Sequence, residues 1–254
     1  MTVLTSPGGA SQNPVQTESP SGFWDGLLFT YNDISLVPDA KYGQVYRHVV
    51  HPSPPSQNPW WWNGTTLYAG LTKYVQVNPG DTQWYWLAVQ LEQWSDGGNS
   101  DMWSTVFQFG YPSVSSPPMS ISPEYGSWCM ERHGGLNGAA EYEVAHLFPW
   151  QPTVGQWVEF LCGVKWTTDA TGSWDISTRN EAQGETGFTQ RYYKTGITTM
   201  QWDSDTPAGP QKNLDKQDLY VGDFAPITGA PTNIVRHSGF VRCSDKQTAQ
   251  SYAV

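Results

Sequence analysis

Residues 192–198 place an amine and a phenol on one side of a predicted β-strand. The run reads Tyr-Tyr-Lys-Thr-Gly-Ile-Thr, and side chains alternate between the two faces of a strand, so Tyr192, Lys194 and Thr198 share a face. An ammonium group inside a sheet costs free energy unless it meets water or an anion. Lys194 is therefore a candidate ligand for an anionic group, with a solvated strand face as the alternative.

Composition indicates one large β domain. The chain has 254 residues, which suits an undivided sandwich or barrel, and 38% of them are hydrophobic. Its 25 Gly and 19 Pro favour many turns. No window keeps an apolar face at helical spacing for three turns, so an all-β fold is expected. Short runs predict strands at 44–50, 67–77, 83–91, 102–109, 157–166, 173–178, 190–201 and 219–224.

The charge balance argues against two classes of partner. The formal net charge is −10, from 13 basic and 23 acidic residues, whereas nucleic acid and anionic membranes attract positive fields. No stretch has the pattern of a signal peptide or a membrane span, so we expect neither signal-driven export nor membrane insertion. Cys129, Cys162 and Cys243 have no metal-ligand spacing and are expected to be buried thiols.

Three regions are expected along the chain. Residues 1–21 are rich in Ser, Pro, Gly, Gln and Thr, so they should form a flexible N-terminal arm. Residues 22–225 contain all the predicted strands and should form the β domain. Residues 226–254 contain several Pro and Gly residues and should form a loop-rich C-terminal extension.

Four motifs, in the expected order, resemble the heparin-lyase-like and alginate-lyase-like polysaccharide lyases. The run at 192–198 is similar to the family's Tyr-x-Lys-x-Gly-x-Tyr strand, and residues 80–86 resemble its Gly-Asp-x-x-Trp-Tyr segment. Residues 155–172 are similar to its Val-Lys-Trp hairpin, and 218–224 to its closing strand. The resemblance spans roughly residues 45–225. It implies a concanavalin-like β-jelly-roll sandwich whose concave sheet holds a glycan.

The resemblance also implies that groups needed for cleavage are missing. Elimination from a uronic acid needs a group that neutralises the carboxylate, a base and an acid. The family's two histidines and its catalytic tyrosine fall on residues that transfer no proton near neutral pH: Gly110, Gly163 and Thr198. Gln108 and Lys194 remain for the carboxylate. His133 and His146, expected in loops, are the histidines that could stand in.

Further residues are candidates for sugar binding. The set expected on one concave surface is Gln108, Gly110, Gly163, Lys165, Tyr192, Lys194 and Thr198. Trp61, within a run of three tryptophans, and Trp103 could stack on sugar rings, with packing onto the sandwich as the alternative. No cofactor or zinc site is expected. Acidic loops at Asp96, Asp101 and 203–205 could bind Ca²⁺, with solvated turns as the alternative.

We therefore expect a non-catalytic glycan-binding or structural protein. Without an export signal, a virion setting is favoured, such as a minor phage tail or capsid-decorating subunit that is cytoplasmic before release. Its partners would be a surface polysaccharide or other virion subunits in an oligomeric assembly. One alternative is an active polysaccharide lyase that uses Lys194, Tyr192, Gln108 and a loop histidine. Another is an interaction module with no role in sugar binding.

Overall fold

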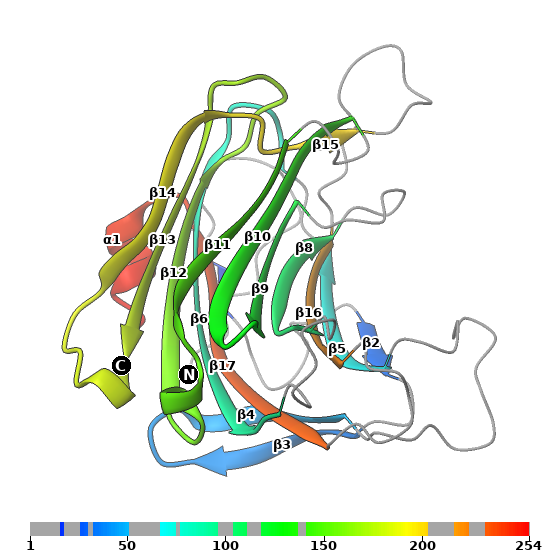
Figure 1. The fold of residues 1–254 in the computed structure, drawn as a ribbon, viewed down its shortest axis with the longest axis vertical. Helices are drawn as coiled ribbons and strands as arrows, with labels where there is room; N and C mark the ends of the chain where they lie inside the picture. Colours follow the sequence, from blue (N-terminus) through cyan, green and yellow to red (C-terminus); the bar gives the residue numbers. More distant parts are fainter. Residues whose placement is uncertain are drawn as a thin grey trace.

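The protein is a β-sandwich, which confirms the predicted all-β jelly-roll class (Figure 1). Every strand expected from the sequence overlaps an observed strand. Within the described residues, no helix is long and apolar enough to cross a membrane. The computed structural model describes residues 16–17, 26–29, 33–50, 67–74, 77–95, 104–110, 118–136, 141–202, 216–223 and 232–253.

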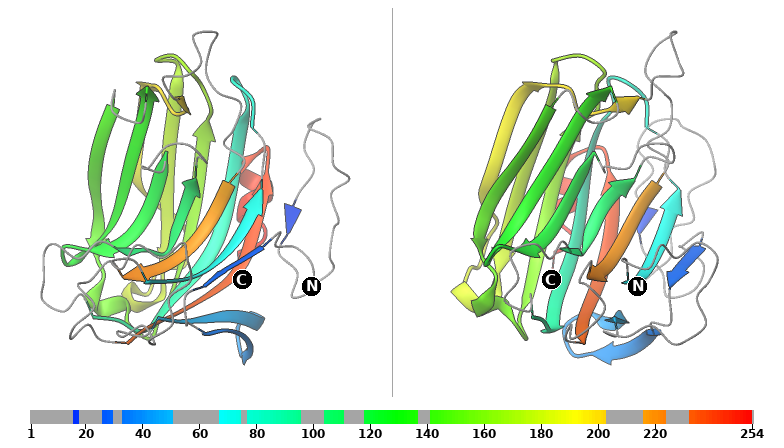
Figure 2. Two further views of the ribbon diagram at one scale, coloured as in Figure 1. Left: turned by 90° about the vertical axis from the view of Figure 1, so that its right-hand side faces the viewer. Right: turned by 45° about the vertical axis from the view of Figure 1, so that its right-hand side comes forward.

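Two sheets face each other in the sandwich (Figure 2). The eight-stranded sheet has the order β14 (Thr189–Ile197), β13 (Gly172–Asn180), β12 (Trp157–Lys165), β6 (Thr82–Gln93), β17 (Asn233–Cys243), β4 (Gly43–Val50) and β3 (Asp33–Asp39), with β1 (Gln16–Thr17) paired to β17. The nine-stranded sheet has the order β11 (Glu141–Pro149), β10 (Ser127–Leu136), β9 (Met119–Glu124), β8 (Phe107–Gly110), β16 (Lys216–Asp223), β5 (Leu67–Tyr74) and β2 (Gly26–Phe29). Beside this path, β15 (Gln201–Trp202) pairs with β10, and β7 (Ser104–Thr105) pairs with β16. The helices are η1 (Gln151–Thr153), η2 (Glu181–Gln183) and α1 (Lys246–Gln250).

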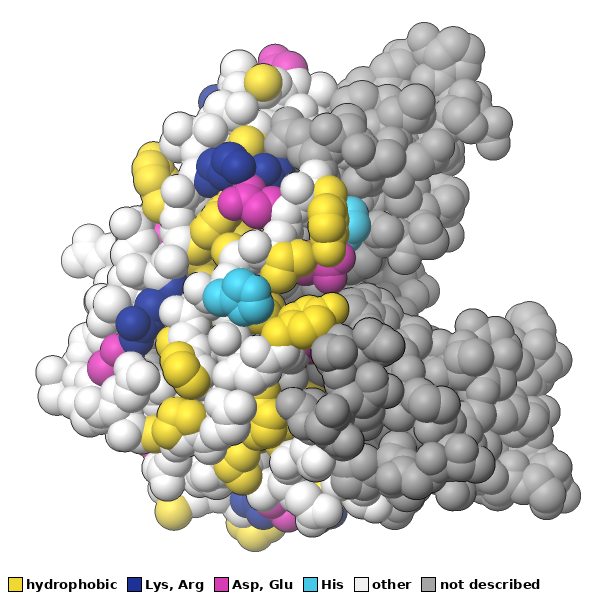
Figure 3. Space-filling model, viewed as in Figure 1, with side chains coloured by type: hydrophobic (Ala, Val, Ile, Leu, Met, Phe, Trp, Pro, Cys, Tyr) yellow, Lys and Arg dark blue, Asp and Glu magenta, His cyan; other side chains and the backbone are white. Residues whose placement is uncertain are grey.

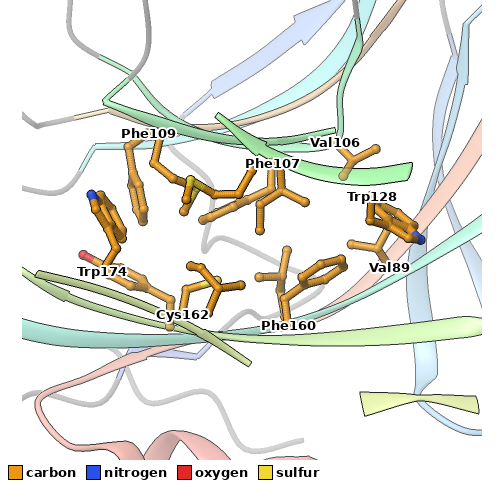
Figure 4. Close-up of a cluster of buried hydrophobic side chains, with 14 of the residues drawn as sticks. Val89, Val106, Phe107, Phe109, Trp128, Phe160, Cys162 and Trp174 are labelled. Carbon is orange, nitrogen blue, oxygen red and sulfur yellow. The ribbon is translucent and has the colours of Figure 1, made fainter. Parts of the chain in front are cut away.

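One apolar cluster fills the space between the sheets (Figure 4). Phe107 and Phe109 of β8 point toward Phe160 and Cys162 of β12. Trp174 of β13 stacks on Phe109 with 5.9 Å between ring centroids. Because side chains alternate between the two faces of a strand, the residues that lie in this core also identify which of their neighbours face outward.

A second apolar cluster lies on the outer face of the eight-stranded sheet. Trp86 of β6, Leu161 of β12 and Ala249 of α1 belong to it, together with Tyr42 from the turn between β3 and β4. Because both faces of the sheet are covered, β6 and β12 are buried along nearly their whole length.

The described part of the expected C-terminal extension, residues 232–253, is not loop-rich, because it forms β17 and α1. β17 lies between β6 and β4 in the middle of the eight-stranded sheet, and α1 packs on the outer face. The pairing of β17 with β6 shifts register between Ser238 and Val241, which interrupts the regular alternation that would reveal a strand. Of the expected N-terminal arm, Gln16–Thr17 forms β1, and the rest lies outside the described residues.

The chain crosses from one sheet to the other after β14. Gly196 has a φ of 71°, in the left-handed region, and β14 ends at Ile197. The Thr167 amide then donates a hydrogen bond to Thr199 Oγ1 at 2.8 Å. Gln201–Trp202 forms β15, which pairs in parallel with β10. This crossing brings β14 beside β10 and β11 at one side of the sandwich.

Candidate functional site

The residues expected on one concave surface lie on different surfaces. On β14, Tyr192 and Lys194 pair with Ile176 and Trp174 of β13, which belong to the core, and directly paired residues share a face. Tyr192 and Lys194 therefore point toward the nine-stranded sheet. Gly163 pairs instead with Asp175, which alternates with those core residues, so it faces outward.

Gly163 and Lys165 lie on the outer face of the eight-stranded sheet. The indole of Trp84 covers Gly163, because a Cβ atom at this position would lie only 2.5 Å from the ring. Lys246 of α1 also approaches this indole, with Nζ 4.8 Å from the ring centroid. Position 163 thus has no space for the family's histidine.

Gln108 lies on the outer face of the nine-stranded sheet, because its neighbours Phe107 and Phe109 point into the core. Gln108 and Lys194 are therefore on different surfaces and do not meet at one carboxylate. Thr198 follows β14, and its backbone oxygen packs against Gly134 of β10. The remaining candidates lie outside the described residues: Trp61, Trp103, Asp96, Asp101 and residues 203–205.

Four polar residues join β14 to β10 and β11, and we call Arg132, Glu143, Tyr192 and Lys194 the edge cluster. Glu143 Oε2 accepts a hydrogen bond from Lys194 Nζ at 2.6 Å and from Tyr192 Oη at 3.1 Å. The same oxygen accepts two from Arg132, from Nη2 at 2.8 Å and Nε at 3.0 Å. One carboxylate oxygen therefore gathers donors from three side chains.

The electrostatics of the edge cluster favour an ion-pair network over proton transfer. The pKa of Tyr192 is raised to about 12, mainly by burial; Arg132 acts to lower this pKa and the Glu143 carboxylate acts to raise it. Partial burial acts to raise the pKa of Glu143, but hydrogen bonds from Lys194, Arg132 and Tyr192 outweigh it and hold that pKa below its ordinary value. Near neutral pH the phenol keeps its proton and the carboxylate keeps its charge.

A second polar group lies on the outer face of the nine-stranded sheet, and we call Tyr125, Glu131, His133, Tyr142 and His146 the β10–β11 face. Glu131 Oε1 is 2.9 Å from His133 Nε2. The rings of His133 and Tyr142 lie 4.9 Å apart between centroids. Figure 3 shows histidine, acidic and hydrophobic or aromatic side chains together on this side of the molecule.

Glu131, His133 and Tyr142 form the group best suited to proton transfer among the described residues. Tyr142 is 62% exposed. Its pKa is raised, first by desolvation and then by the negative charge of Glu131, so the phenol remains a proton donor near neutral pH. Glu131 holds the His133 imidazole in place, as carboxylates do for catalytic histidines.

The other end of the β10–β11 face carries a second exposed tyrosine. Tyr125 and Gly126 have φ values of 48° and 73°, which is the pattern of a type I′ hairpin turn. Tyr125 is 57% exposed, and its ring lies 6.4 Å from that of His146. His146 follows Tyr142 by four residues on β11, so these two residues lie roughly 14 Å apart along the strand.

Sequence reasoning placed His133 and His146 in loops, whereas both lie on strands. It also missed Glu131 and Tyr142, because β9, β10 and β11 were not predicted. The outward residues of β9 and β10 are Ser, Glu, Cys and His rather than strong strand formers. The alternation of Met-Ser-Ile-Ser at 119–122 was the signal that could have found them.

No metal site is evident in the described part of the chain. It contains no group of three or more His, Cys, Asp or Glu side chains that could hold an ion. Cys129, Cys162 and Cys243 are buried free thiols. Burial raises the pKa of Cys129 to about 12, so this residue is a neutral thiol beside His146 Nδ1, 3.4 Å away.

Comparisons with known proteins show the fold. No protein family and no curated protein matches the sequence. The structure is similar to an endo-β-1,4-glucuronan lyase from the fungus Trichoderma reesei, with a TM-score of 0.65 and 13% identity over 91% of this chain and 94% of the lyase. It is also similar to the binding domain of botulinum neurotoxin serotype C1, with a TM-score of 0.51 and 9% identity over 95% of this chain and 48% of the toxin chain. The chain thus spans about half of that toxin chain, and it shares the β-jelly-roll sandwich of a polysaccharide lyase.

Proposed function

We propose that this protein binds a polysaccharide on the β10–β11 face. The observation that carries the proposal is the pair of exposed tyrosines, Tyr125 and Tyr142, on one sheet face with hydrogen-bonding groups between them. An exposed aromatic ring offers a flat apolar surface to a sugar ring, and Glu131, His133 and His146 offer acceptors and donors for its hydroxyls. The sandwich shared with a glucuronan lyase supports the same reading.

The contacts within the edge cluster argue against a catalytic role for Lys194 and Tyr192, the residues that the sequence first suggested. Lys194 and Arg132 are already paired with Glu143, and the proton of Tyr192 is directed at the same carboxylate. A uronate would have to displace Glu143 to use these cations. Gln108, the other candidate for the carboxylate, lies on a different surface.

A second candidate function, elimination from a uronic-acid polymer, is favoured by the contact of Glu131, His133 and Tyr142. In this reaction His133 would take the proton next to the sugar carboxylate. Tyr142 would protonate the leaving oxygen as the C–O bond breaks and a C=C bond forms. Ultraviolet absorbance of the new C=C bond, measured with oligoglucuronate, separates this candidate from binding alone. Steady product formation that His133→Gln abolishes would establish the lyase.

Tyr142→Ala tests the binding site. We expect dissociation constants for the oligosaccharide that wild type binds to rise about threefold to tenfold, because stacking on an aromatic ring contributes about 0.5–1.5 kcal/mol. Calorimetry with a neutral β-1,4-linked gluco-oligosaccharide and with oligoglucuronate measures this. Tyr193→Ala is the matched control, because Tyr193 is 60% exposed on the opposite sheet. Equal weakening by both variants, or no binding by wild type, would refute the proposed site.

The virion setting and the oligomeric assembly expected from the sequence stay predictions, because the similarity to solved structures describes only the fold of this chain. Cofractionation of the protein with assembled virus particles is the measurement that checks them. The expected contacts with partner subunits also stay predictions, and the same measurement checks them.

A further inference from the structure

The β10–β11 face has an acidic residue but no lysine or arginine. Strands β9, β10 and β11 contain one basic residue of these two types, Arg132. It pairs with Met119 of the core, so its side chain points between the sheets, where it contacts Glu143. Glu131, its neighbour on β10, therefore points outward. A ligand on this face meets a carboxylate and no permanent positive charge from these strands.

Glu131 lies between the two exposed tyrosines. It pairs with Val144, in the middle of β11. Tyr142 and His146 lie two residues before and after Val144, on the same outward face. The His146 ring lies 6.4 Å from that of Tyr125. A glycan chain that reaches both tyrosines therefore passes over Glu131.

The Glu131 side chain is accessible to a ligand. It is 18% exposed, and the neighbouring Tyr142 is 62% exposed. Glu124 is the other acidic residue that β9, β10 and β11 present outward, and it is only 5% exposed. Glu131 is therefore the charge on this face that a bound sugar can contact.

The surroundings of Glu131 make its charge effective. Partial burial strengthens its action on a ligand, because charges interact more strongly where less water screens them. Desolvation and then the negative charges of Glu131 and Glu124 raise the pKa of Tyr142, so the potential at its hydroxyl is negative. His133 Nε2 lies 2.9 Å from Glu131 Oε1, but an imidazole, unlike an ammonium group, carries no permanent charge.

An ammonium group matches this arrangement. It donates up to three hydrogen bonds, and bonds between ionised groups are about twice as strong as neutral ones. It is also attracted to the face of an aromatic ring such as that of Tyr142. A uronate carboxylate would be repelled by Glu131. An amino sugar supplies both a ring that stacks on tyrosine and an ammonium group for the carboxylate.

We propose that Glu131 determines the charge specificity of the β10–β11 face, and that the preferred polysaccharide contains amino sugars with free amines. The inference rests on the proposed function and deepens it, because it names the class of glycan. A neutral glycan uses the tyrosine rings and hydroxyl contacts and binds more weakly. A uronate binds most weakly of the three.

Glu131→Gln tests this specificity, because it keeps the shape of the side chain and removes its charge. Calorimetry on the full chain at about pH 6, where sugar amines are charged, uses a β-1,4-linked glucosamine oligosaccharide and a neutral gluco-oligosaccharide of equal length. The dissociation constant for the glucosamine oligosaccharide should rise about tenfold in the variant. That for the neutral oligosaccharide should change far less, because Gln keeps an acceptor oxygen. Added salt should weaken binding of the amino sugar to wild type more than binding of the neutral sugar.

Glu143→Gln is the matched control. It makes the same change in net charge, and Glu143 is also partly exposed, but its side chain points between the sheets. Affinity for the glucosamine oligosaccharide should stay at the wild-type value.

Three outcomes would overturn the charge specificity and leave polysaccharide binding intact. They are equal affinity of wild type for the charged and neutral oligosaccharides, equal weakening by both variants, and tighter binding of oligoglucuronate. If Glu131→Gln loses all binding, the salt dependence of wild type decides, and an amino-sugar affinity that salt does not change would contradict the proposal. Binding of no oligosaccharide by wild type would overturn the specificity and the proposed function together.

Discussion

The two outer faces of the sandwich are built in opposite ways. The eight-stranded sheet is covered on its outer side by α1 and Tyr42, and Trp84 fills the space over Gly163. The nine-stranded sheet instead carries Ser120, Glu131 and other hydrogen-bonding side chains on its outer side. The first face is a second hydrophobic core, which stabilises the fold. On the second face, Gln108 Oε1, Ser120 Oγ and Ser122 Oγ are buried and have no hydrogen-bond partner among the described residues.

The largest expected loss of stability follows from replacing Glu159, a fully buried carboxylate on the outer face of the eight-stranded sheet. It accepts hydrogen bonds from Tyr42 Oη at 2.8 Å, Trp86 Nε1 at 3.2 Å and Arg179 Nη2 at 2.5 Å. Glu159→Ala should lower the free energy of unfolding by about 3 kcal/mol, because it leaves a buried network without its acceptor. Urea denaturation measures the loss.

Glu181→Ala is the control for Glu159. Glu159 and Glu181 both pair with Lys41, but Glu181 is far more exposed, so its removal should cost less than about 1 kcal/mol. Similar losses for the two variants would mean that the covered face is not a core.

Gly163→His restores the histidine that the lyase resemblance places at this position. We expect it to destabilise the fold by about 1–3 kcal/mol, because the side chain must displace the Trp84 indole. No lyase activity should appear, since Lys194 and Gln108 lie on other surfaces. Gly187→His is the matched control, because a Cβ atom at position 187 meets nothing within 4 Å. If Gly163→His were as stable as this control, the face would be open rather than packed.

The edge cluster should show the smallest effect, and one that depends on pH. The folded-state pKa of Glu143 lies below its ordinary value of 4.5, so its ionised form stabilises the fold above that pH. Glu143→Gln should therefore cost about 1 kcal/mol at neutral pH, where wild type is more stable. As pH falls below 4.5 and through the folded-state pKa, wild type should lose this advantage and the two should converge. Urea midpoints across this range measure it, and a pH-independent difference would contradict the ion-pair account.

The sequence was sufficient for the fold class but not for the site. Strands such as β6 and β12 are long apolar runs with strong strand formers, so the framework was predictable. The face that each strand presents depends on the register between strands, which one sequence does not contain. Tyr193, not Lys194, pairs with the strand position opposite Gly163, so the assumed common surface was wrong.

The proposed site escaped prediction for a related reason. Glu131, His133 and Tyr142 come together only because β10 and β11 form a hairpin that pairs His133 with Tyr142. A register shift after Trp128 determines which residues of β10 and β11 are paired, and the local sequence pattern does not indicate this shift. The motif resemblance pointed to Lys194, whereas the pairing of β10 with β11 brings Glu131, His133 and Tyr142 together.

The position of β17 has a consequence for how the chain folds. This strand lies between β6 and β4, although more than 130 residues separate it from either strand in the sequence. During synthesis β4 and β6 emerge long before β17, so each waits with an unpaired edge until the last strand inserts between them. We expect slow folding that depends on this late closure, in keeping with contacts between residues far apart in the chain. A nascent chain released before β17 would expose two apolar strand edges and should aggregate.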